Sequence, residues 1–312
     1  MNANSQAIII FCSHMCVPEG TKPLEPREWT MLAEKLLERG LSPKDILKFS
    51  TSDFVSELEL DSSFAQRLMR LTDRSAGLFS AVSACINAGI NIYTRADREY
   101  PAKLKHKLGM KCPPLFYCAG DITIAELHAA GYVGSRHINE DDENFTCITV
   151  RKTCAHRLGV VSGGARGVDS AAAQTALAEG WPVIEYIAGE LLSLLAKKDI
   201  RDSVSMGKRL ILSEAVPDAG FSVGWAMSRN QYIYAQSEAA VIIRADLKKG
   251  GTWHGAEENL RHKWCPMFCR DMDYPGNIAL IAKGAVPINE DWDGDITRTE
   301  NAGGQIVIPY PQ

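Results

Sequence analysis

Six short apolar segments alternate with helical patterns between residues 131 and 285, and this alternation restricts the fold more than any other feature of the chain. Parallel strands are buried on both faces and need crossover helices between them, so they appear as nearly continuous apolar runs separated by helical patterns of ten or more residues. The apolar segments are GYVG, VVSGG, WPVIEYIAG, KRLILSEA, EAAVIIRAD and PMFCRD. We therefore predict a doubly wound α/β domain with a mostly parallel sheet over residues 86–290.

The first 85 residues follow a different pattern, that of several short helices. Trp29, Leu32 and Leu36 recur at helical spacing before Gly40, and Ser42 followed by Pro43 is typical of a helix start. We predict a small helical domain of the helix-hairpin-helix or SAM-like kind, with either a binding role or only a packing role. Residues 291–312 are predicted to form a C-terminal tail, in which IVIPYPQ has the pattern of one more edge strand.

Charge and composition limit the partners of the chain. With 312 residues and a formal net charge of −4, it lacks a long-range positive field that would attract nucleic acid, so a polyanion would need a local cluster of Lys and Arg. The apolar run at residues 7–12 is far shorter than the ~20 residues of a membrane span and lacks the flanks of a signal peptide. Together with the odd number of nine cysteines, this leads us to expect a cytoplasmic protein without membrane association.

Basic and glycine-rich groups follow the predicted strands. In open α/β sheets ligands bind beyond the carboxyl ends of the strands, where glycine turns, helix N-termini and arginines can hold anions. One such loop is usually just a tight connection, but four of them at one edge of a sheet indicate phosphate or nucleic-acid binding. The candidates are Gly134, Ser135 and Arg136; Ser162, Gly163, Gly164, Arg166 and Gly167; Arg229 and Asn230; and Lys249, Gly250, Gly251 and Thr252.

Aromatic residues lie close to these loops in the sequence. An exposed ring beside an arginine can stack an unpaired base, which contributes ~1–3 kcal/mol per base. Trp225 and Trp253 are the candidates because they are predicted to lie in or next to loops. Phe221, Tyr232 and Tyr234 lie nearby as well. Most of these aromatic residues are expected in the core, since Tyr232 and Tyr234 fall in a helical pattern.

The glycine-rich segment does not match the common nucleotide motifs. Residues 163–167 read G-G-x-x-G, without the G-x-G-x-x-G and the acid at the next strand end that NAD requires, and no G-K-[S/T] follows a glycine turn. GVVSGG lacks the G-x-S-x-G pattern of a nucleophile elbow. We expect no cofactor and no catalytic residue.

Two groups of cysteines and histidines are too poorly spaced for a zinc site. They are Cys12, His14 and Cys16, and His254, His262, Cys265 and Cys269. We therefore expect no metal.

The signatures in the α/β region resemble those of the DprA/Smf family of DNA-processing proteins over residues 90–286. They are YPAKL, CPPLFYCAGD, GYVGSR, VVSGGARGVDSAAAQTAL, LSEAVP, SRNQYIYAQSEAAVII, KGGTWHGA and GNIALIAKGA. The resemblance implies an extended Rossmann-like fold, a homodimer, and single-stranded DNA bound in a basic pocket. It also implies delivery of that DNA to a RecA-type recombinase in natural transformation. By motif position, Ser135, Arg136, Arg166 and Arg229 would line the DNA channel.

The chain departs from the family pattern at several positions. Gln174 and Gln231 stand where the family usually has His and Arg, and residues 250–252 replace the usual Gly-Ser turn. No winged-helix domain fits after residue 290. A divergent member could act in phage defence or genome maintenance instead of DNA uptake.

Our leading hypothesis is a non-enzymatic single-stranded DNA-binding protein, and two alternatives stay open. One is a nucleoside-monophosphate phosphoribohydrolase, whose GG-x-GT loop is partly matched by KKGGTWHGAEE, with Glu257 or Glu258 as the acid. For these two residues, stabilisation of a helix N-terminus is the simpler role. The other alternative is a sensor of a nucleotide signal.

Overall fold

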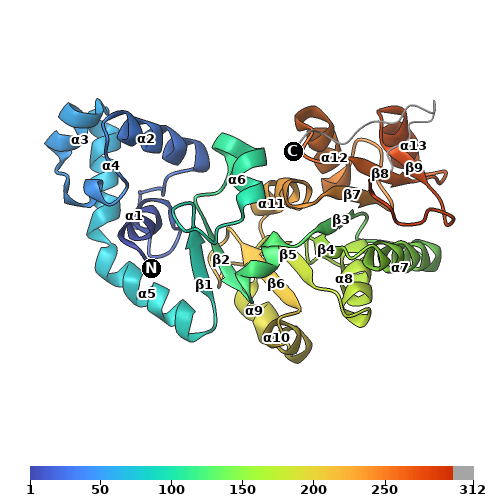
Figure 1. Ribbon diagram of the computed structural model, residues 1–312. Helices are drawn as coiled ribbons and strands as arrows, with labels where there is room; N and C mark the ends of the chain where they lie inside the picture. Colours follow the sequence, from blue (N-terminus) through green and yellow to red (C-terminus); the bar gives the residue numbers. More distant parts are fainter. Residues whose placement is uncertain (298–312) are drawn as a thin grey trace. The chain divides into compact units, whose positions relative to one another are not determined.

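The computed structural model describes residues 1–297 and divides the chain into two compact units (Figure 1). Unit 1 comprises Met1–Ala119 and Ser213–Ala219, and unit 2 comprises Gly120–Leu212 and the chain from Gly220 onward. The division between these units lies near residue 119. The domain boundary near residue 85 stays a prediction. The edge strand predicted for IVIPYPQ lies outside the described residues.

Unit 1 is mainly helical. Its helices are α1 (Ala3–Cys12), α2 (Pro26–Glu38), η1 (Asp45–Lys48), α3 (Thr51–Leu58), α4 (Ser62–Asp73), α5 (Ser75–Asn87), α6 (Ala102–Leu108) and η2 (Gly109–Lys111). Capping residues set several of the helix starts; Asp61, for example, accepts from the Phe64 N–H at the start of α4. Strands β1 (Asn91–Thr94) and β2 (Leu115–Ala119) pair antiparallel.

Unit 2 is a parallel sheet covered by helices. Its strands are β3 (Ala129–Val133), β4 (Gly159–Ser162), β5 (Val183–Ile187), β6 (Arg209–Ser213), β7 (Ala239–Ile242), β8 (Met267–Arg270) and β9 (Val286–Ile288). Its helices are η3 (Ile122–Glu126), α7 (Glu140–Ala155), α8 (Val168–Ala178), α9 (Leu191–Leu195), α10 (Lys198–Ser205), α11 (Val223–Gln236), α12 (Gly250–His262) and α13 (Pro275–Ala282). The predicted α/β class with a mostly parallel sheet is confirmed.

The strand order of unit 2 is β6-β5-β4-β3-β7-β8-β9. From β3 the chain winds outward through β4 and β5 to β6, and from β7 it winds the other way through β8 to β9. β3 and β7 are parallel neighbours, with Val133 opposite Ile242. The point where the winding reverses therefore lies between the ends of β3 and β7, and such a switch point is where open α/β sheets bind ligands.

Successive residues of β3 show which helices cover each face of the sheet. Tyr132 points toward α7, where its hydroxyl lies 3.1 Å from that of Thr153. The next residue back, Gly131, faces Ile233 of α11 and Ser237, the residue that follows this helix. Because side chains alternate along a strand, α7 and α11 cover opposite faces. Within residues 1–297 every helix falls short of the length and continuous apolarity that a bilayer span requires.

Candidate functional site

A cavity of about 450 Å³ opens at the switch point. Residues 134–137, which follow β3, line one wall, and Arg244 and Asp246, which follow β7, line another. The first turns of α11 and α12 complete it. We call this the sheet-edge cavity. Residues that follow β3 and β7 therefore line one cavity, and its role as a ligand site stays a prediction.

Most of the predicted phosphate-binding residues line this cavity or the one beside it. The sheet-edge cavity is lined by Gly134, Ser135, Arg136, Arg229, Asn230, Lys249, Gly250, Gly251 and Thr252. A neighbouring side cavity of about 210 Å³ is lined by Gly163, Gly164 and Arg166 together with Arg136 and Arg229. Because Arg136 and Arg229 line both, the two cavities share a wall.

Four predicted residues line neither cavity. Ser162 is fully buried at the end of β4. Trp253 is 1% exposed and its indole N–H donates to Glu257, so it offers no free face and the predicted base-stacking role is wrong for this residue. Trp225 belongs to α11, which begins at Val223, earlier than the sequence predicted, and it is absent from both cavity walls.

Gly167, the fourth, acts through the backbone. Its φ of +79° and ψ of −129° belong to a region that residues with a β-carbon rarely adopt. A β-carbon there would lie 2.4 Å from the Ser135 carbonyl oxygen and 2.9 Å from the Arg136 backbone. Glycine therefore allows the loop after β3 to lie directly against the start of α8, which fixes the position of Arg136.

Arg136 and Arg166 supply the uncompensated positive charge of the site. Both side chains are exposed, and among residues 1–297 neither has a carboxylate within ion-pair distance. Lys249 is likewise exposed at the N-terminus of α12. Exposed cations without internal partners keep their charge available to an anion from solution.

Arg229 differs from Arg136 and Arg166, because it is 8% exposed and lies 3.6 Å from the buried carboxylate of Asp169. Burial lowers the pKa of Arg229, and the charge of Asp169 opposes that effect. The guanidinium packs on the Gly163 backbone, where a β-carbon would lie 1.4 Å from Nη1. The predicted role of Arg229 as a free phosphate ligand is therefore reduced, since its charge is largely compensated within the fold.

Asp169 also organises the glycine-rich loop. Its carboxylate accepts from the N–H groups of Gly163 and Ala165, at 3.1 and 3.3 Å. Burial raises the pKa of Asp169, while Arg229 and these two donors act in the opposite direction. The sequence analysis assigned the loop N–H groups to a phosphate, but two of them face this internal carboxylate.

An exposed aromatic ring does lie at the site, and it is Phe221. The ring is 51% exposed, lines both cavities, and has the Arg136 guanidinium 5.2 Å from its centroid. This pair has the geometry of a cation–π contact and presents a flat apolar surface beside a charge. From the sequence, Phe221 is one of the aromatic residues near the basic loops, but Trp225 and Trp253 are preferred over it; its place in a loop before α11 is the signal that could have identified it.

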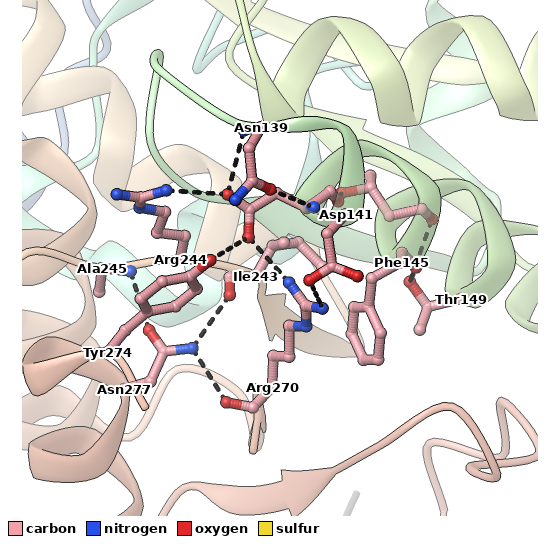
Figure 2. Close-up of polar contacts among 12 residues, drawn as sticks. Asn139, Asp141, Phe145, Thr149, Ile243, Arg244, Ala245, Arg270, Tyr274 and Asn277 are labelled. Carbon is pink, nitrogen blue, oxygen red and sulfur yellow. Dashed lines mark hydrogen bonds and ion pairs between the residues drawn. The ribbon is translucent and has the colours of Figure 1, made fainter. Parts of the chain in front are cut away.

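Arg244 is a cation of the sheet-edge cavity that the sequence analysis did not select. Asp142, which is fully buried, accepts from Arg244 at 3.0 Å, Arg270 at 2.8 Å and the Tyr274 hydroxyl at 2.9 Å. Figure 2 shows these three side chains pointing toward one another around this carboxylate, and Arg270 also reaching Asp141. The hydrogen bond that Arg244 donates to Asp142 raises the pKa of Arg244. Arg244 is thus held rigidly in the cavity wall, with much of its charge balanced.

The N-terminus of α12 contributes backbone donors. Lys249 is its N-cap and supplies no side-chain cap, and residues 250–252 of the first turn line the cavity. The first N–H groups of a helix have no partner within the helix, and they attract anions. Asn230 of α11 holds this turn by donating to the Gly251 carbonyl at 3.2 Å.

The acids considered for glycosidic cleavage do not face the cavities. Glu257 accepts from Trp253 and pairs with Lys283, and neither Glu257 nor Glu258 lines the sheet-edge or side cavity. In the described part of the chain, His, Cys, Asp and Glu side chains form no group of three that could hold a metal ion.

Comparisons with known proteins agree with this architecture. The model of the family described as DNA recombination-mediator protein A matches residues 91–296. The structure of DNA processing protein A from Streptococcus pneumoniae superposes with a TM-score of 0.67 at 19% identity, covering 85% of this chain and 95% of that one. A search of curated proteins finds no match.

A second solved structure is that of DNA processing protein A from Helicobacter pylori, described for its single-stranded DNA binding mode. It superposes with a TM-score of 0.53 at 24% identity, covering 64% of this chain and 92% of that one. At these identities the two structures support the fold, and the family match rests on the sequence of residues 91–296.

Proposed function

Because the chain belongs to the DNA recombination-mediator protein A family, we propose that it binds single-stranded DNA along the carboxyl edge of its parallel sheet. One observation carries the proposal: the exposed, unpaired Arg136 and Arg166 lie in two adjoining cavities that also contain a helix N-terminus and an exposed ring. Phosphates would bind the guanidinium groups and the first turn of α12. An unstacked base would lie on Phe221, as bases do on aromatic residues in single-strand binding sites.

The rest of the site serves to hold these groups in place. Gly167 brings the loop after β3 against α8, and Asp169 fixes the glycine-rich loop together with Arg229. Rigid support of this kind reduces the entropy lost when a flexible strand binds. Contacts to phosphates and stacking on a ring do not read the edges of the bases. We therefore expect binding with little sequence preference.

The proposal extends to the biological role. A member of a recombination-mediator family would deliver the bound strand to a RecA-type recombinase, in natural transformation or in another recombination process, and would act in the cytoplasm as a homodimer. In a strand-exchange assay with the recombinase and a competing single-strand binding protein, we expect the chain to shorten the lag before filament assembly. An unchanged lag would limit its role to DNA binding.

Salt-dependent binding tests the site itself. For single strands, log K falls against log salt with a slope of about −0.7 for each neutralised phosphate. Arg166→Ala should weaken binding of unrelated oligonucleotide sequences alike and reduce the magnitude of the slope by about 0.7. Arg261→Ala, an exposed cation near the other end of α12, is the control and should leave the slope unchanged.

Three measurements separate the alternatives. Equal slopes for Arg166→Ala and the parent protein would contradict the assigned site. Release of free base from a nucleoside monophosphate would favour the phosphoribohydrolase. A melting temperature raised by a mononucleotide but unchanged by single-stranded DNA would favour a nucleotide sensor.

A further inference from the structure

Unit 1 has a hollow of its own, in a part of the chain that precedes the residues matched by the family model. It measures about 400 Å³ and lies between the loop of residues 20–22 and one face of α4. We call it the helical-unit hollow. The α4 residues that line it are Ser63, Gln66, Arg67 and Arg70, spaced so that they share one face of the helix. No large apolar side chain lines it, so the hollow does not suit an apolar ligand.

Arg67 fixes the shape of the hollow. Its guanidinium donates to the backbone carbonyls of Lys22 and Pro23, at 2.7 and 2.6 Å, and to both carboxylate oxygens of Glu28, at 2.7 and 2.9 Å. Burial would raise the pKa of Glu28, but the hydrogen bonds from Arg67 and the Glu25 backbone lower it overall. The loop is therefore fastened to α4, and Glu28 is already engaged by Arg67.

Two cations in the hollow have no carboxylate beside them among the described residues. Lys22 and Arg70 are both exposed, and in the part of the chain that the structure describes neither is within ion-pair distance of a carboxylate. Between them, the Gln66 side chain can donate a neutral hydrogen bond. Thr21 lines the same hollow, and within residues 1–297 its hydroxyl oxygen is buried without a hydrogen-bond partner. A buried hydroxyl without a partner is uncommon, and a water or ligand atom that reached it would satisfy it.

From this arrangement we propose that the helical-unit hollow is a second phosphate-binding site, which holds the backbone of a single-stranded nucleic acid. The two free cations and the neutral donors suit phosphate oxygens, and the wall contains no ring on which a base could stack. The site would thus hold the strand by its phosphates and read no sequence. A strand long enough to reach both sites would bind more tightly than at either alone, because the second contact is intramolecular.

The test uses the full chain with the double variant Lys22→Gln/Arg70→Gln. Binding of a fluorescent oligothymidylate of about 40 nucleotides is followed by anisotropy between 50 and 200 mM salt. Loss of two phosphate contacts should reduce the magnitude of the log–log slope by about 1.4, so the parent protein should lose about sevenfold more affinity over this range than the variant. Lys44→Gln/Lys48→Gln, which removes two exposed charges elsewhere in unit 1, should keep the parent slope.

Equal slopes for the hollow variant and the parent would overturn the proposal, as would equal reductions in the hollow variant and the Lys44/Lys48 control. The salt slope of the double variant Arg136→Ala/Arg166→Ala distinguishes a failure of this proposal from a failure of the site proposed at the sheet edge. If only the hollow variant changes the slope, the second site stands and the function proposed for the sheet edge fails. Acetylation of Lys22 in the parent provides a second readout: protection by the oligothymidylate supports the proposal, and protection by inorganic phosphate alone assigns the hollow to a free anion and overturns it.

Discussion

Two groups of arginines lie at the carboxyl edge of the same parallel sheet, and they differ in what balances their charge. Arg136 and Arg166 are exposed and lack an internal carboxylate among the described residues. Arg244 and Arg270 instead converge on the buried Asp142, and Arg270 also pairs with Asp141 (Figure 2). The first group is suited to an anion from solution, and the second holds the ends of α7, β7 and β8 together.

The difference shows that an arginine at a strand end is not by itself a ligand-binding residue. Moving a charge out of water costs several kcal/mol, so a buried arginine needs a carboxylate or several hydrogen-bond acceptors beside it. An exposed arginine needs no such partner and folds equally well without a ligand. The comparison therefore predicts large stability effects in the paired group and mainly binding effects in the free group.

The largest effect is expected for Asp142→Ala. Removing this carboxylate leaves Arg270, which is 3% exposed, with only the half-exposed Asp141, and leaves Arg244 without a partner. Breaking a buried ion pair from one side typically costs about 3–5 kcal/mol, and we expect the free energy of unfolding in urea to fall by that amount. Asp141→Ala is the matched control, for which a loss below about 1 kcal/mol is expected. Similar losses for the two variants would show that Asp142 has no special role.

Gly167→Ala should have the next largest effect. Its backbone conformation and the contact at 2.4 Å with the Ser135 carbonyl leave no room for a methyl group, and the obstructing atom is backbone. We expect a loss of roughly 1–3 kcal/mol in thermal or urea unfolding, together with weaker DNA binding because the Arg136 loop must shift. Gly180→Ala, also at positive φ but with nothing near its β-carbon, is the control for backbone strain alone. A loss no greater than that of the control would show that the loop contact is unimportant.

The sequence predicted the sheet and the basic and glycine-rich residues at its carboxyl edge because both depend on local patterns. Apolar runs separated by helical patterns identified β3 to β8, and residues that follow β3, β4, β5 and β7 line the two cavities. Trp225 and Trp253 were misplaced because α11 and α12 extend further toward the loops than their patterns suggested, and Trp253 lies on the buried face. Arg244 also follows a strand, but it was interpreted as part of the apolar segment.

The pairing around Asp142 could not be predicted from the sequence. Arg270 lies 128 residues after Asp142 in the chain, and the acidic run at the start of α7 is equally typical of a helix N-terminus stabilised by its own charges. Only the strand order brings β7 and β8 beside the start of α7. Whether an arginine is free or paired is thus decided by tertiary contacts, whereas its place at a strand end is decided locally.

A smaller effect, of opposite sign, is expected for Tyr234→Phe. Tyr234 lines the sheet-edge cavity and is 1% exposed, and its hydroxyl lacks a hydrogen-bond partner within residues 1–297. Burial raises the pKa of this phenol, so it stays neutral. Since an unsatisfied buried polar group costs about 1–3 kcal/mol, removing it should raise the free energy of unfolding by about 1 kcal/mol. A destabilised variant would show that the hydroxyl is hydrogen-bonded in solution.

The smallest effect compares one arginine of each group in DNA binding. Arg136→Ala should reduce the magnitude of the log–log salt slope by about 0.7, which corresponds to about a threefold smaller loss of affinity between 50 and 200 mM salt. Arg244→Ala should change the slope less, because Asp142 already balances part of the charge of Arg244. The same variant should lose more stability than Arg136→Ala, because the buried Asp142 carboxylate would then pair with Arg270 alone. Anisotropy titrations and urea unfolding on the same two proteins measure both quantities. If Arg244→Ala changed the slope as much as Arg136→Ala without a loss of stability, the division into free and paired arginines would be wrong.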